Sequence, residues 1–316
     1  MTVKHDRAQP GSKVPFNVRA GPSGVHLFNR TTGINILLDE VQVPASLWAA
    51  APRHVSFALT NACDLACSYC YAPKYRSALN VESLCQWLDE LDANGCIGVG
   101  FGGGEPTLYR DLPELCRHAT QKTGLAVTLT THGHHLDDAL VAALYGNVHF
   151  VRISMDGIGT TYELLRGRSF AALLRRLEIV RSLAPFGINY VVNSRTLPEL
   201  SAATTLASDL GAAEFLLLPE QPTKGSGGVD PDTVVGLREW VACNRGTIAM
   251  TVSEAGADGL PTCNPFPRET GLSSYAHVDA AGDLKRSSFD SGGTAIGEDG
   301  LMRALKVLRA QEEAQL

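Results

Sequence analysis

Residues 59–71 read LTNACDLACSYCY and place three cysteines, Cys63, Cys67 and Cys70, on one short loop. Three residues separate the first pair of cysteines and two separate the second. Three thiolates can hold an iron–sulfur cube by three corners, whereas complete ligation of a cube usually takes four cysteines. The fourth iron is then open to a small molecule. The spacing therefore predicts a reactive [4Fe–4S] cluster on this loop.

Other roles for these cysteines remain open at this point. A structural zinc site usually uses two C-x-x-C-like pairs, and the chain has no second pair. A disulfide framework is typical of exported proteins, whereas the polar N-terminus is not followed by the apolar segment of a signal peptide. A chance grouping of buried thiols is the third alternative.

A second motif, VGFGGGEP, occupies residues 99–106. It follows the cysteines by ~30 residues, the length expected for a helix and the next strand of a repeating unit. Glycines such as Gly103 and Gly104 let the backbone approach a ligand closely. An exposed Glu105 carboxylate would accept hydrogen bonds from an ammonium group. Alone, the motif is also compatible with a plain turn.

Together the two motifs resemble those of the radical S-adenosylmethionine (SAM) superfamily, which are C-x-x-x-C-x-aromatic-C and G-G-E-P. Tyr69 fills the aromatic position. The resemblance implies that Cys63, Cys67 and Cys70 bind one [4Fe–4S] cluster and that SAM is the second cofactor. It also implies that Glu105, with Gly103 and Gly104, binds the SAM ammonium and that Tyr69 lies near the adenine.

From residue 53 to about 252, strand and helix patterns alternate, which indicates a parallel sheet with helices on its outer face. We predict an α/β fold, a partial (β/α)6 barrel of the TIM type, in which chemistry gathers at the carboxyl ends of the strands. An open doubly wound sheet would show the same alternation. The expected strands are 54–59, 97–101, 126–131, 149–155, 188–193, 214–218 and 247–252. The expected helices are 81–94, 112–122, 137–144, 170–182, 197–210 and 232–243.

Four further SAM-binding residues follow from the resemblance to SPASM-type members of the superfamily. Ser154 contacts SAM, and Arg166 pairs with its carboxylate, to which an arginine can donate two parallel hydrogen bonds. Asn193 binds ribose hydroxyls, and Leu218 covers the adenine. A surface role at a helix end is the alternative for Arg166.

Catalytic residues are not identified by the sequence, and only two weak candidates emerge. Glu220 faces the mouth of the predicted barrel, although a solvated loop carboxylate is the more economical interpretation. His132 stands where the family often has asparagine, and with His134 and His135 it favours metal binding and substrate contact about equally. Asp156 is expected to order its own turn as an Asx motif.

We divide the chain into residues 1–52, 53–260 and 261–316. The first part comprises a polar tail, residues 1–20, and a β-hairpin of 25–28 and 34–38. The last part comprises a hairpin of 275–279 and 284–288 and a helix, 299–311, with Asp299 as its N-cap.

The last part resembles a reduced form of the SPASM or twitch extension, in which cysteines hold auxiliary clusters. Cys263, Gly282 and the Ile-Gly step at 296–297 match that layout. Serines at 287 and 288 stand where a second cysteine is expected. Only Cys243 and Cys263 are then available beyond the barrel, and two thiols are too few for an auxiliary cluster. We therefore predict one cluster per chain.

Bulk composition limits the class of protein. A chain of 316 residues with 44% hydrophobic residues can build one large core. The formal charge of −6 argues against a nucleic-acid partner, and no apolar run approaches the ~18 residues of a membrane span. Eight cysteines without an export signal indicate reduced thiols and a cytoplasmic protein. Cys85, Cys96 and Cys116 fall in apolar patterns and are expected in the core.

The resemblance implies a radical SAM enzyme that reductively cleaves SAM to a 5′-deoxyadenosyl radical, which abstracts hydrogen from the substrate. We expect the substrate to be a ribosomally made peptide, and the reductant to be a protein such as flavodoxin or ferredoxin. A sugar or nucleoside of natural-product biosynthesis is the alternative substrate. A non-enzymatic iron–sulfur protein is the second alternative, and SAM cleavage on reduction separates it from the enzyme. The N-terminal hairpin either guides a leader peptide by strand addition or caps the barrel.

Overall fold

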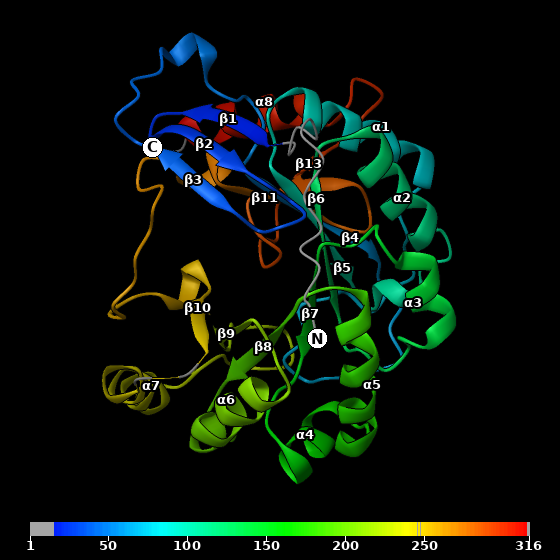
Figure 1. Ribbon diagram of the computed structural model, residues 1–316, viewed down its shortest axis with the longest axis vertical. Helices are drawn as coiled ribbons and strands as arrows, with labels where there is room; N and C mark the ends of the chain where they lie inside the picture. Colours follow the sequence, from blue (N-terminus) through cyan, green and yellow to red (C-terminus); the bar gives the residue numbers. More distant parts are fainter. Residues whose placement is uncertain (1–15, 245, 247, 315–316) are drawn as a thin grey trace, which may run out of the picture.

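A ten-stranded sheet forms the centre of this computed structural model, which describes residues 16–314 except 245 and 247 (Figure 1). The strand order is β10-β9-β8-β7-β6-β5-β4-β11-β12-β13, and all neighbours from β4 to β10 are parallel. This is the predicted α/β partial barrel, with β10 added at one edge. The parallel strands are β4 (His54–Thr60), β5 (Gly98–Gly103), β6 (Ala126–Thr131), β7 (Phe150–Ser154), β8 (Phe186–Val192), β9 (Glu214–Pro219) and β10 (Ala249–Val252).

Helices connect these strands and lie along the outer side of the sheet (Figure 1). Side chains of Asn80, Asp137, Ser169 and Asp230 cap four of them, each by accepting a hydrogen bond from a backbone N–H in the first turn. One helix, α4, was not predicted. The helices are α1 (Val81–Ala93), α2 (Leu112–Lys122), α3 (Asp138–Leu144), α4 (Gly159–Arg166), α5 (Phe170–Leu183), α6 (Leu200–Asp209), α7 (Pro231–Cys243) and α8 (Leu301–Glu313).

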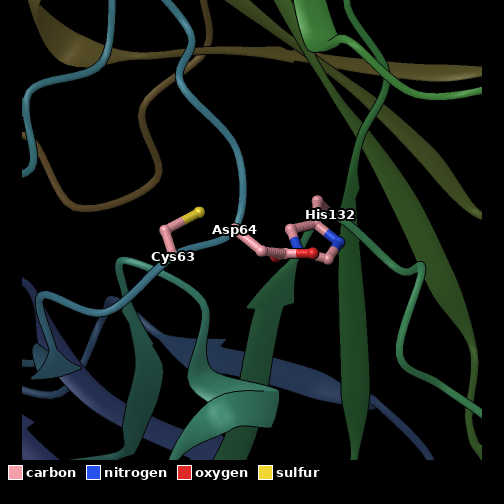
Figure 2. A group of neighbouring side chains, drawn as sticks. All are labelled: Cys63, Asp64 and His132. Atoms are coloured by element: carbon pink, nitrogen blue, oxygen red, sulfur yellow. The ribbon is translucent and has the colours of Figure 1, made fainter.

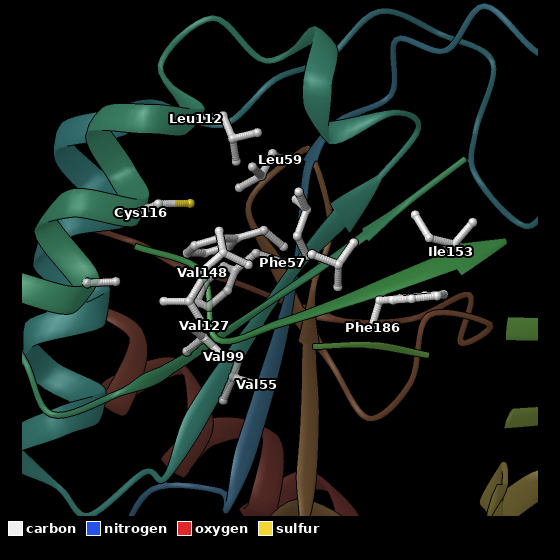
Figure 3. Close-up of a cluster of buried hydrophobic side chains, with 14 of the residues drawn as sticks. Val55, Phe57, Leu59, Val99, Leu112, Cys116, Val127, Val148, Ile153 and Phe186 are labelled. Carbon is white, nitrogen blue, oxygen red and sulfur yellow. The ribbon is translucent and has the colours of Figure 1, made fainter. Parts of the chain in front are cut away.

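The main core lies between the sheet and its helices (Figure 3). Alternate residues of β4, namely Val55, Phe57 and Leu59, are at most 1% exposed and face the helices. The residues between them face the inside of the barrel. Cys96 and Cys116 are buried and Cys85 is half-buried against the same core, as predicted. In the described part of the chain, no helix has the length and apolar character needed to cross a membrane.

A separate three-stranded sheet precedes the barrel. Its strands are β1 (Asn17–Gly21), β2 (Gly24–Phe28) and β3 (Asn35–Leu38), paired antiparallel in the order β1-β2-β3. The predicted hairpin is confirmed as β2 and β3. The prediction of a polar tail over residues 1–20 is wrong for residues 17–20, which form β1, while residues 1–15 lie outside the described part.

One buried ion network fixes this small sheet to the barrel. The Nε atom of Arg19, a residue 3% exposed, donates to Glu269 Oε2 at 3.1 Å, and its Nη atoms donate to the carbonyls of Ala51, Gly95 and Ser273. Arg53 Nη2 donates to the other oxygen of Glu269 at 2.6 Å. The local sequence of 16–21 gives no sign of these distant partners, which explains why β1 was missed.

The C-terminal residues extend the barrel sheet. Strand β11 (Tyr275–Val278) lies parallel to β4, and the predicted hairpin pairs it with β12 (Asp283–Lys285), followed by β13 (Thr294–Ala295). Gly282 makes the turn with φ of 91°. Helix α8 begins at Leu301 with Gly300 as its N-cap and no side-chain cap, so Asp299 is not the N-cap. The predicted division after residue 260 stays a prediction.

Candidate functional site

The three cysteines lie on the loop that leaves the carboxyl end of β4. Cys63, Cys67 and Cys70 are half-buried and none forms a disulfide. The Cys70 N–H donates to the Cys67 carbonyl at 3.2 Å, and the Leu65 N–H donates to the Cys63 Sγ at 3.4 Å. Burial raises the pKa of the Cys63 thiol. The loop therefore presents three unpaired thiols at the end of the barrel where chemistry is expected.

The glycines that end β5 pack against the start of this loop. The Gly104 N–H donates to the Thr60 carbonyl at 2.6 Å, and the Glu105 N–H donates to the Ala62 carbonyl at 2.7 Å. A Cβ at Gly103 would lie 2.6 Å from the Thr60 oxygen, and one at Gly104 would lie 2.3 Å from the Ala62 oxygen. These glycines are therefore required for contact between two strand ends, whereas the sequence predicted contact with a ligand.

We expect Gly104→Ala to destabilise the protein by about 1–3 kcal/mol, because the new methyl group overlaps a backbone oxygen and one of the two segments must move. Gly102→Ala is the matched control on the same strand. Its Cβ would meet only Thr130 atoms, at 3.7 Å or more, so its stability should be unchanged or raised by up to about 1 kcal/mol. Urea unfolding measures both. Equal stability of the two variants would contradict the proposed packing role of Gly104.

Glu105 is held by the protein itself. It is 1% exposed, so the expectation of an exposed carboxylate is wrong. Its Oε1 accepts from the Thr107 N–H at 3.1 Å, the Thr107 hydroxyl at 2.6 Å and the Thr131 hydroxyl at 2.5 Å. Its Oε2 accepts from the His132 N–H at 3.0 Å. Glu105 therefore ties the end of β5 to the end of β6.

A second buried carboxylate, Asp156, joins three other elements. It is 1% exposed and accepts from the Tyr69 hydroxyl at 2.6 Å and the Val191 N–H at 2.7 Å. It also forms an ion pair with Arg166 at the end of α4. The prediction that Asp156 orders only its own turn is wrong, because its oxygens bind the cysteine loop, β8 and α4.

These contacts change the pKa values of Tyr69 and Arg166, the two side chains that bind Asp156. Burial and the charge of Asp156 raise the pKa of Tyr69, so the phenol stays protonated and donates its hydrogen bond. Burial opposes the charge of Arg166, but the Asp156 carboxylate outweighs it and raises the pKa of Arg166. Arg166 Nη1 also lies 3.7 Å from the Cys67 Sγ. Arg166 is therefore a cation beside the cysteine loop, and the alternative of a surface helix end is wrong.

Asn193 and Glu220 meet at the ends of β8 and β9. The Asn193 amide donates to Glu220 Oε2 at 2.7 Å, and the Ser226 hydroxyl donates to Glu220 Oε1. Glu220 is 9% exposed, so its interpretation as a solvated carboxylate is wrong. Leu218, on β9, and Ser154, at the end of β7, are half-buried. All of these positions follow from the parallel strands, whose carboxyl ends lie at one edge.

His132 is buried at the end of β6 and contacts Asp64, the residue after the first cysteine (Figure 2). His132 Nε2 lies 2.9 Å from Asp64 Oδ1, and the ligand atoms of Cys63, Asp64 and His132 lie within 4.8 Å of one another. Burial opposes ionisation of Asp64, but the hydrogen bond and charge of His132 and the charge of His135 lower the pKa of Asp64 to about 2. His134 instead contacts the Tyr162 hydroxyl at 2.8 Å.

The residues at this edge fit a polar cofactor. Buried polar atoms normally have a hydrogen-bond partner. Three buried side-chain nitrogens of the described residues have no such partner, and two of them, Arg166 Nε and Asn61 Nδ2, lie at this edge. Both belong to the surroundings of the cysteine loop. With three free thiols beside them, the donor set suits an iron–sulfur cluster and a ligand that carries a carboxylate.

Comparison with known proteins agrees with this arrangement. Residues 57–196 match the family described as the Radical SAM superfamily, and this stretch runs from β4 to the loop after β8. Residues 57–196 thus form a radical SAM domain.

Two curated relatives and one solved structure illustrate the similarity. The chain is 31% identical to the AdoMet-dependent heme synthase of Methanosarcina barkeri over 60% of this chain and 58% of the relative. It is 29% identical to the sporulation killing factor maturation protein SkfB of Bacillus subtilis over 60% of this chain and 48% of the relative. The chain therefore spans only about half of either relative. Streptococcus suis SuiB, crystallised with its precursor peptide SuiA, shares the fold with a TM-score of 0.72 and 13% identity, over 92% of this chain and 87% of SuiB.

Sequence reasoning named the cysteines, Glu105, Arg166, Asn193 and Glu220, and the structure brings these residues to one edge. It missed Asp64, Thr107 and Thr131, and it gave Asp156 the wrong role. A signal for Asp156 was present in the sequence. Asp156 comes just after the buried strand β7, and Arg166, a cation that needs an anionic partner, ends the helix that follows. Asp64 carried no such signal, since its position after a cysteine is compatible with any polar residue.

Proposed function

We propose that this chain is a radical SAM enzyme that modifies a ribosomally made peptide. The observation that carries the enzyme class is the set of three free thiols, Cys63, Cys67 and Cys70, at the carboxyl end of β4 beside the Gly-Gly-Glu strand end. The peptide substrate is supported by the relatives, since SkfB is named as a maturation protein and SuiB was crystallised with a precursor peptide. We infer a cytoplasmic setting, which keeps the thiols reduced.

Each residue has a definite task in this proposal. Cys63, Cys67 and Cys70 hold one [4Fe–4S] cluster, and Asp156 fixes Tyr69 and Arg166 beside it. Arg166 Nε, which has no partner among the described residues, donates to the SAM carboxylate. When bound, the cluster and SAM supply an electron and a 5′-deoxyadenosyl radical that abstracts hydrogen from the substrate.

The remaining SAM contacts come from the other strand ends. Glu105 keeps the ends of β5 and β6 together and, with Gly103 and Gly104, lines the place of the SAM amino group. Ser154 lies at the end of β7, Asn193 is assigned to the ribose, and Leu218 to the adenine. Glu220 orients Asn193 through the 2.7 Å hydrogen bond between them. Neither Glu220 nor His132 is assigned a proton transfer.

We also propose one cluster per chain. Cys243 and Cys263 are both exposed, and the half-buried serines at 287 and 288 cannot supply thiolates. A net two-electron oxidation is easier with an auxiliary cluster that accepts an electron. A single cluster therefore favours redox-neutral outcomes such as epimerisation or rearrangement, and it permits a cross-link if the electron returns to the same cluster.

The test of function is SAM cleavage by the reconstituted protein. Under anaerobic conditions with dithionite, we expect 5′-deoxyadenosine and methionine in equal amounts. We expect a short precursor-peptide gene beside the gene of this chain, and its peptide should raise the rate of cleavage and change in mass. Absence of 5′-deoxyadenosine from protein that holds about four iron per chain would refute the enzyme class. Cleavage that only a sugar or nucleoside stimulates would refute the peptide substrate.

Arg166→Lys tests the SAM carboxylate contact. Lysine keeps the positive charge for Asp156 but lacks the second parallel N–H, so we expect SAM to bind at least about tenfold more weakly. This factor corresponds to the roughly 1.5–3 kcal/mol of a charge-assisted hydrogen bond. Isothermal titration of SAM into cluster-loaded protein measures it. The control is Arg168→Lys, which alters a half-exposed arginine paired with Asp64. Equal SAM affinity of the two variants would remove Arg166 from the site.

A further inference from the structure

An exposed basic segment follows the cysteine loop. Lys74 and Arg76 are exposed, and Tyr75 between them is 56% exposed although it is a large aromatic residue. Neither cation forms an ion pair with another residue in the described part of the chain. The whole chain has a formal charge of −6, so unpaired cations beside one another are a local departure from its balance.

The C-terminal end of this segment is fixed to the barrel and to the C-terminal extension. The Asn61 N–H donates to the Ser77 carbonyl at 2.9 Å, and the Leu79 N–H donates to the Leu59 carbonyl at 2.9 Å. The Ser77 hydroxyl donates to the Ala280 carbonyl at 2.6 Å. Because Lys74 is the fourth residue after Cys70, the Cα atoms of these two residues are at most about 14 Å apart.

A third cation approaches the cysteine loop from the segment after β9. A Cβ on Gly225 would lie 2.3 Å from the Ser68 oxygen, so this segment lies directly against the cysteine loop. Its neighbour Lys224 is exposed and likewise has no ion-pair partner among the residues that the structure describes. Backbone hydrogen bonds between Thr223 and Ser226 hold the turn. Two segments far apart in sequence thus bring unpaired cations to the same loop.

We propose that Lys74, Arg76 and Lys224, the basic patch, form the docking surface for an acidic one-electron carrier protein. This inference rests on the proposed function, because it concerns delivery of the electron that the cluster needs. The carrier gives up one electron and the cluster gains it, with no atom transferred. Complementary charge steers such encounters and raises the association rate about 10- to 1,000-fold. The exposed ring of Tyr75, which lies between Lys74 and Arg76 in the sequence, supplies apolar contact.

The position of the basic patch favours an electron carrier over an acidic substrate peptide. A carrier must come close to the cluster. The patch begins at the fourth residue after Cys70, and Lys224 adjoins Gly225, which lies against Ser68. A peptide substrate instead has to reach the inside of the barrel. A peptide that competes with the carrier for the patch is therefore an outcome of the test that would overturn the proposal.

The test compares a charge-reversed variant, Lys74→Glu/Arg76→Glu/Lys224→Glu, with the control Lys306→Glu on the exposed side of α8. Oxidised flavodoxin and a plant-type ferredoxin are the two probes, and titration calorimetry at low and high salt measures their binding. We expect at least about tenfold weaker binding of one or both carriers to the charge-reversed variant, and loss of its salt dependence. Because this measurement needs no cluster, it stays informative even if the variant loads less iron.

Reduction of the cluster gives a second readout. In stopped flow, the charge-reversed variant should be reduced slowly by the carrier but at the normal rate by dithionite. Binding and carrier-driven reduction that match the control with both carriers would overturn the docking surface, as would displacement of the carrier by substrate peptide. An error in the proposed function would give a different result from an error in the docking surface. If the protein were not a radical SAM enzyme, dithionite would yield no 5′-deoxyadenosine from any variant.

Discussion

Protein in which Cys63, Cys67 and Cys70 are all replaced by alanine is expected to bind no iron and to cleave no SAM, while keeping its fold. The reason is that the three thiols are the ligands we assign to the cluster, and all are free and half-buried at one strand end. Wild-type protein should hold about four iron and four sulfide per chain. Iron analysis, visible absorbance and circular dichroism measure the three consequences.

Cys243→Ala/Cys263→Ala is the matched control, because both cysteines are exposed and lie outside the barrel edge. It should retain the iron content and spin spectrum of the wild type. A cubane signal that persists in the triple variant and disappears when Cys263 is also replaced would contradict the single cluster. Unchanged iron content in the triple variant would contradict the whole assignment.

Arg166→Ala should be the most destabilising substitution of a charged residue near the site, with a loss of about 3–5 kcal/mol. Asp156 is 1% exposed and Arg166 is its cationic partner, so the variant leaves a buried carboxylate without compensation. Tyr69→Phe removes one hydrogen bond to the same carboxylate and should cost about 1.5–3 kcal/mol. Urea unfolding of protein without SAM measures both losses.

Two comparisons make this prediction specific. Arg168→Ala removes an arginine whose partner Asp64 is more accessible, and it should cost less than about 1 kcal/mol. The double variant Asp156→Ala/Arg166→Ala should be less destabilised than the sum of its single variants, because no lone charge remains. Additive losses would show that the ion pair does not act as a unit.

The alternation of strands and helices was predictable because each strand buries one face under a helix. The spacing of the apolar residues and the turn residues between the elements mark that pattern in the sequence. The edge at which Cys63, Glu105 and Asn193 lie was predictable for a related reason, since parallel strands end on the same side. Arg166 reaches this edge from α4, a helix that was not predicted. Individual contacts were not predictable. Tyr69 and Asp156 are 87 positions apart, and nothing local in either segment reveals that they share a hydrogen bond.

The same limit explains the errors at Glu105 and Glu220. A carboxylate at a strand end looks exposed in sequence when a proline adjoins it, as Pro106 adjoins Glu105 and Pro219 adjoins Glu220. Whether it is solvated depends on hydroxyls and amides from other strands, such as Thr131 for Glu105 and Asn193 for Glu220. Strand β1 was missed for a similar reason, since its buried Arg19 is stabilised by residues about 250 positions away.

Strand β11 gives the C-terminal extension a structural role, because it covers the edge of β4. It occupies the side of β4 opposite β5, and without it the amide and carbonyl groups of the first barrel strand would form an open edge. Open edges recruit strands from other molecules and lead to aggregation. Selection for solubility therefore preserves an extension that covers this edge, whether or not the extension binds a metal. Deleting residues 261–316 should therefore yield insoluble protein, and loss of cysteines from this extension carries no such penalty.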